Sequence, residues 1–84
     1  MGADRKVRLR ADDDPEAARL LDSLTPQETR VIAQVAAGCT NKEIARSLEL
    51  SDKTVKNYLS NAFQKLQVRR RSRAAALFSR RNRT

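Results

Sequence analysis

The sequence predicts an all-α fold of four helices, with an additional short helix on their N-terminal side. Apolar residues recur at intervals of three and four along successive segments, which is the spacing of one face of a helix. Residue types that cap helices precede most of these segments. The 84 residues include only two Gly and two Pro, too few for the many tight turns of a small β-protein.

The first 23 residues are expected to form a basic arm and the short helix. Residues 5–10 (RKVRLR) make up the arm. Pro15 suits the first position of a helix and Asp14 suits its N-cap, because a carboxylate accepts from N–H groups that lack a partner within the helix. The helix has one apolar face for packing, made of Ala17, Leu20, Leu21 and Leu24.

A capping box predicts where the next helix begins. Thr25 and Glu28 have the spacing at which each side chain accepts from the other residue's backbone N–H, and Pro26 fits the first helical position. An apolar stripe follows, made of Val31, Ile32, Val35 and Ala36. Gly38 tolerates the left-handed backbone conformation that commonly ends a helix.

The next two helices follow at short intervals. A second capping box, Thr40 and Glu43, starts a short helix that should end near Glu49. Ser51 then caps a longer helix that runs to about Leu66. A short helix, a tight turn and a longer helix have the spacing of a helix-turn-helix unit.

A last helix is expected over residues 70–81. The chain is accordingly divided into an N-terminal arm and helix (1–23), a helical domain (24–81) and a tail (82–84). Positive charge gathers at the C-terminal end, since residues 67–84 hold seven Arg and no acidic residue within a net charge of +8. Such a distribution favours a polyanionic partner, nucleic acid first and an anionic membrane surface second. A solvated arginine-rich surface without a partner is the alternative.

The helix that follows Ser51 has two different faces. Its apolar face is formed by Val55, Leu59, Ala62 and Leu66. The opposite face has no acidic residue and includes Lys53, Lys56, Asn57 and Ser60. Lys donates to guanine, Asn forms paired hydrogen bonds with adenine, and Ser suits either base, so we expect these four side chains to contact base edges. An ordinary polar helix surface is the alternative.

Several residues are placed to contact DNA phosphates. The first turn of a helix offers unpaired N–H groups at its positive end, and polar side chains there add further donors. The expected phosphate contacts are Thr40, Asn41, Lys42, Ser51, Thr54, Tyr58 and Arg71. For Thr40 and Ser51, helix capping alone is the alternative, and the two roles are compatible.

Residues 24–78 resemble the DNA-binding domain of LuxR/NarL/GerE-type regulators. The matching motifs are LTPQE (24–28), GCTNKEIA (38–45), LSDKTVKNY (50–58) and KLQV (65–68). The KTVKNY run is most similar to the response regulators that control dormancy in actinobacteria. The resemblance implies four helices, the third of which enters the major groove with Lys53, Lys56 and Asn57 at the bases.

The resemblance also implies a two-fold dimer through the last helix. Ala74 and Ala75 would allow close helix approach, with Leu77 and Phe78 as anchors. Packing of this apolar face within its own monomer is the alternative. Two positions depart from the family pattern: Gln67 stands where many members have Gly, and Arg70 where a small capping residue is common.

Together these features predict a dimeric, sequence-specific DNA-binding transcriptional regulator that binds an inverted repeat. Expected partners are double-stranded DNA, a second copy and RNA polymerase, in the bacterial cytoplasm at the nucleoid. Two alternatives stay open: a protein-interaction adaptor that dimerises with a longer family member, and a promoter-binding domain like sigma-factor region 4. Residues 1–23 are too short for a receiver or ligand-binding domain, so the chain is either a stand-alone regulator or an output domain.

Other classes of function are not expected. The sequence has no His and one Cys, so neither a zinc site nor a disulfide within the chain is predicted. No residue pattern indicates an enzyme, a cofactor or a small-molecule substrate. Cys39 is interpreted as a small, partly buried apolar residue. No run of apolar residues approaches the length needed to span a membrane.

Overall fold

A computed structural model describes residues 15–81, and all of their regular secondary structure is helical, which confirms the all-α prediction. The helices are α1 (Pro15–Asp22), α2 (Pro26–Ala36), α3 (Asn41–Leu48), α4 (Asp52–Leu66) and α5 (Arg71–Arg81). The basic arm, the Asp14 cap and the tail at 82–84 lie outside the described residues. None of the helices within 15–81 has both the length and the apolar content that crossing a membrane would take.

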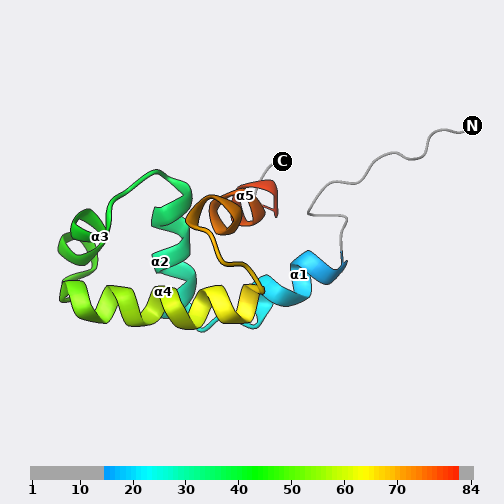
Figure 1. The fold of residues 1–84 in the computed structure, drawn as a ribbon, viewed down its shortest axis with the longest axis horizontal. Coiled ribbons are helices and arrows are strands. Elements are labelled where there is room, and N and C mark those ends of the chain that lie inside the picture. The colour runs from blue at the N-terminus through cyan, green and yellow to red at the C-terminus, as the bar shows by residue number, and fades with distance from the viewer. Residues whose placement is uncertain (1–14, 82–84) are drawn as a thin grey trace, which may run out of the picture.

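The longest helix, α4, forms one side of the molecule (Figure 1). Helix α2 contacts both α4 and α5, and α3 packs against α4 near the end where α4 begins. Helix α1 contacts α4 and α5 at the other end of the molecule. The short connection between α3 and α4 makes these two helices the predicted helix-turn-helix pair.

The core consists of aliphatic side chains from every helix. Its largest fully buried members are Val31, Ile32, Ile44, Val55 and Leu66. The predicted apolar face of α4 is buried along its whole length, at Val55, Leu59, Ala62 and Leu66. Because one face of α4 is buried, the opposite face is directed away from the core.

The helix starts are where the capping residues predict them. Thr25 Oγ1 accepts from the Glu28 N–H at 3.1 Å, and a Glu28 carboxylate oxygen accepts from the Thr25 N–H at 2.9 Å. Thr40 and Glu43 form the same reciprocal pair at 3.1 and 2.8 Å. The last helix begins at Arg71, one residue later than predicted.

Three residues with a left-handed backbone conformation lie just after the C-terminal ends of α2, α3 and α4. Gly38 was expected there and has φ 91°. Glu49 ends α3 with φ 57° and Gln67 ends α4 with φ 60°. A left-handed non-glycine residue costs about 1–2 kcal/mol, which hydrogen bonds such as that from the Val68 N–H to the Phe63 carbonyl at 3.0 Å help to offset.

Helix α1 is part of the same folded body. Ala17 and Leu21 are buried and Leu20 is partly buried against the core, as its apolar face predicted. Just after the helix, the Ser23 hydroxyl donates to the Leu20 carbonyl at 2.6 Å. Leu24 is also buried in the core, so the connection between α1 and α2 packs against the rest of the domain.

Candidate nucleic-acid interface

The outer face of α4 is exposed and carries the four side chains expected to contact bases. Lys53, Lys56, Asn57 and Ser60 are all exposed, while Val55 and Leu59 between them are buried. Neither lysine forms an ion pair with any residue of the described range. The two ammonium groups are therefore available for an external anion or base.

The N-terminus of α4 is fixed by its own first turn. Ser51 Oγ accepts from the Thr54 N–H at 3.0 Å and donates to Thr54 Oγ1 at 2.8 Å. Because Thr54 Oγ1 accepts from Ser51, its own O–H is oriented to donate elsewhere. Tyr58 is half-buried and packs against the core, so its ring position is set by that packing.

The N-terminus of α3 offers further hydrogen-bond donors. Thr40 and Lys42 are exposed, and Asn41 is half-buried. Thr40 Oγ1 accepts from the Glu43 N–H, as in a capping box, so the N–H groups of residues 41 and 42 do not donate to this cap. The positive end of the α3 dipole adds to the attraction for an anion.

Arg71 connects the start of α5 to the start of α3. Its Nη1 donates to Asn41 Oδ1 at 2.7 Å, and its Nη2 donates to the Cys39 carbonyl at 2.5 Å. The guanidinium has no carboxylate partner within residues 15–81. The sequence placed Arg71 near phosphates but gave no signal for this contact, because the residues lie 30 and 32 positions apart.

The residues expected at a dimer interface have different environments. Ala74 is fully buried in its own monomer, which is the packing that the sequence left open. Ala75, Leu77 and Phe78 are half-buried and pack against the core. Leu77 shares a hollow with Leu20 of α1, so α1 contributes to the same surface as α5.

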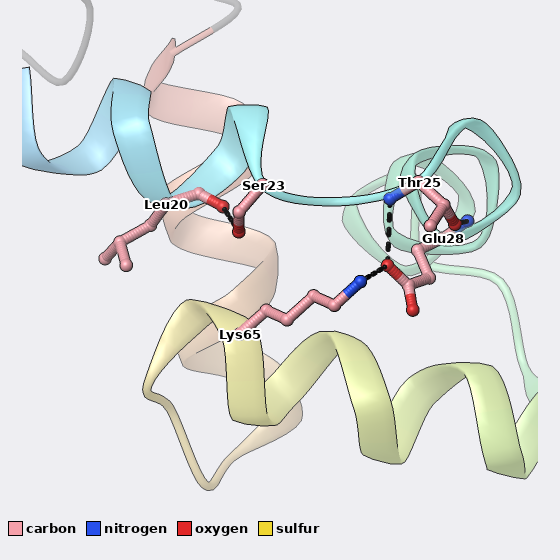
Figure 2. A network of polar contacts seen from close by, with 5 residues as sticks. All are labelled: Leu20, Ser23, Thr25, Glu28 and Lys65. Atoms are coloured by element: carbon pink, nitrogen blue, oxygen red, sulfur yellow. Dashed lines mark hydrogen bonds and ion pairs between the residues drawn. The ribbon is translucent and has the colours of Figure 1, made fainter.

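A partly buried ion pair joins α4 to α2 (Figure 2). Lys65 Nζ lies 2.8 Å from Glu28 Oε1, the same oxygen that accepts from the Thr25 N–H. Glu28 is only 4% exposed. Burial by itself raises the pKa of Glu28, but the hydrogen bonds from Lys65 and Thr25 outweigh it and bring the pKa below its ordinary value. The sequence predicted the cap but missed Lys65, which lies 37 positions away.

A helix-turn-helix pair with an exposed, basic second helix defines a DNA-binding domain of the type predicted from the sequence. The family described as bacterial regulatory proteins of the luxR family matches residues 22–78, more than half of the chain. The chain belongs to the luxR family and contains the DNA-binding domain of its transcriptional regulators. This confirms the resemblance to LuxR/NarL/GerE-type domains and the prediction that the chain is not an enzyme.

Individual relatives are regulators from several bacteria. The chain is 46% identical over 75% of its length to a nitrate/nitrite response regulator protein homolog of Haemophilus influenzae, covering 30% of that protein. It is 41% identical over 84% of its length to the transcriptional regulatory protein LnrK of Bacillus subtilis, covering 32%. The DNA-binding transcriptional activator DevR/DosR of Mycobacterium tuberculosis is 46% identical over 66% of this chain, which covers 25% of that protein.

These matches concern one part of each relative. The chain spans about a quarter to a third of the length of these three proteins. No solved structure gives a significant match to the chain.

Proposed function

We propose that this chain binds DNA sequence-specifically as a dimer, with α4 of each copy in a major groove of an inverted repeat. The observation that carries the proposal is the exposed, acid-free face of α4. Its proposed base contacts are Lys53, Lys56, Asn57 and Ser60. Each is exposed, and their side chains donate or accept as the major-groove edges require.

The proposed phosphate contacts lie at the starts of three helices. At α3 they are Thr40, Asn41 and Lys42, at the positive end of the helix dipole. At α4 they are Ser51, Thr54 and Tyr58. Arg71, at the start of α5, completes the set, since its positive charge is not offset by any carboxylate within residues 15–81.

The proposed dimer contact uses the half-buried side chains of α5. Ala75, Leu77 and Phe78 would face the partner, with Ala74 beneath them in the monomer core. A two-fold arrangement of α5 helices would place the two α4 helices in successive major grooves, about 10 base pairs apart. We further propose RNA polymerase as a partner, and a location in the bacterial cytoplasm at the nucleoid.

Selection of bound sequences from a random duplex pool tests the proposal. A two-fold symmetric motif with half-sites about 10 base pairs apart is the expected result. An asymmetric motif would contradict the dimer and leave base recognition in place. A pool without enrichment at physiological salt would contradict sequence-specific binding and favour the adaptor alternative.

A further inference from the structure

The contact of Arg71, in α5, with the start of α3 constrains the Asn41 side chain as well as the guanidinium. The two acceptors of Arg71 lie at the start of α3: the Cys39 carbonyl is in the turn that leads into the helix, and Asn41 Oδ1 is on its first residue. The N–H groups of a guanidinium form a planar, rigid fork, so two bonds to one turn orient that turn and the arginine together. No residue of α3 itself provides this constraint on Asn41.

The bond to Oδ1 determines which way the Asn41 amide faces. An asparagine amide has one acceptor atom and one donor atom. Because Arg71 donates to Oδ1, Nδ2 is the atom that is left to donate, and it has no partner within residues 15–81. A phosphate oxygen needs a donor, whereas the reversed amide would present an oxygen to it.

We propose that Arg71 is a positioning residue for DNA binding, which acts by holding the Asn41 amide with Nδ2 toward a phosphate. This inference rests on the proposed function, in which the start of α3 contacts the DNA backbone. A lysine at this position would keep the charge and lose the fork. The geometry of the fork, more than the charge, is what the contact requires.

NMR relaxation of the Asn41 side-chain amide in the free protein is the first test. In the wild type the amide should be as ordered as the backbone, with an order parameter of about 0.85. In Arg71→Lys and Arg71→Gln it should fall below about 0.6, and the exposed-arginine control Arg73→Gln should leave it unchanged. An amide equally ordered in the wild type and in both Arg71 variants would overturn the proposal. This result does not depend on DNA binding.

A double-mutant cycle on the selected duplex is the second test. Asn41→Ala should weaken binding by about 3- to 10-fold, the range of one hydrogen bond. In an Arg71→Gln background the same change should add less than about twofold, because the amide is no longer held. Arg71→Lys should lose the contribution of Asn41 as Arg71→Gln does, but it should keep the charge and an unchanged salt dependence and so bind better than Arg71→Gln. Circular dichroism should show both variants folded.

The controls separate this inference from the proposed function. In an Arg73→Gln background, Asn41→Ala should keep its full effect, because Arg73 is exposed and makes no contact with Asn41. If the effects of Arg71→Gln and Asn41→Ala simply multiply, Arg71 acts on the DNA independently of Asn41 and the inference is wrong. If the wild type binds no duplex, the proposed function fails, and the amide measurement still decides what Arg71 does.

Discussion

At the residue scale, the chemistry of α4 depends on which side of the helix each residue occupies. Val55 and Leu59 are buried, while Lys56 and Asn57 between them are exposed. Lys56 and Asn57 do not pack in the core, so a substitution at either position should alter DNA recognition without altering the core. This separation makes substitutions on the outer face informative.

Lys56→Ala and Asn57→Ala should each weaken binding to the selected site by about 1–3 kcal/mol and relax discrimination at one base pair. The measurement is titration of labelled duplexes that carry each base at each position. Asn61→Ala, an exposed asparagine on the same helix outside the proposed set, is the matched control. Unchanged discrimination in Asn57→Ala would show that Asn57 does not contact a base.

Glu28 is a buried carboxylate whose charge should contribute to stability. Glu28→Gln keeps the shape and removes the charge that Lys65 contacts. A hydrogen bond to a charged group is worth about 1.5–3 kcal/mol, and the partial exposure of Lys65 reduces it, so a loss of about 1–2 kcal/mol is expected at pH 7.

The effect of this substitution should depend on pH. Because the pKa of Glu28 is lowered on folding, its contribution is complete above the pKa of the unfolded chain, about 4.3, and is lost as the pH falls through the folded pKa. Urea unfolding at pH 7, 5 and 3 should therefore show wild type and Glu28→Gln converging only at the lowest pH. A constant difference at all three values would mean that the charge of Glu28 is not the cause.

At the scale of elements, the two capping boxes have the same local chemistry and different surroundings. Thr25 starts α2, whose first turn faces α4 through Glu28 and Lys65. Thr40 starts α3, and its capping partner Glu43 is exposed. The Thr25 cap therefore stabilises the fold alone, whereas the Thr40 cap stabilises the fold and lies at the proposed phosphate contact.

Thr25→Ala and Thr40→Ala should each lower the free energy of unfolding by about 1 kcal/mol, as the loss of an N-cap does. Only Thr40→Ala should also weaken DNA binding, when affinity is measured well below the unfolding temperature. Equal affinity in the two variants would contradict a phosphate contact at the start of α3.

At the scale of the whole molecule, the proposed dimer fixes the distance between two copies of α4. Helix α5 carries the proposed contact, and its position relative to α4 is set by α2, which contacts both. The DNA site should therefore tolerate changes in sequence between the half-sites better than changes in their separation.

Inserting about 5 base pairs between the half-sites turns the two major grooves to opposite sides of the duplex, and cooperative binding should be lost. Insertion of about 10 base pairs returns the two major grooves to the same side of the duplex and serves as the control for added length. The measurement is the concentration dependence of binding to the three duplexes. Equal binding to the 5-base-pair insertion would show that the copies bind independently.

Local features of the sequence were enough to predict most of the fold. A capping box involves residues three apart, and a buried face involves residues three and four apart, so both are visible along the chain. The starts of α2, α3 and α4 and the acid-free face of α4 were predicted on this basis. Left-handed Glu49 was not, because nothing local distinguishes it from a residue in a helix.

What the sequence alone determined is where α2, α3 and α4 begin and which face of α4 is buried and which is left exposed. Only the tertiary structure decided that Lys65 meets Glu28, that Arg71 holds Asn41, and that Ala74 lies inside its own monomer. The reason is distance along the chain. Each of these environments depends on how helices far apart in sequence cross, and that geometry is set by the packing of the whole core.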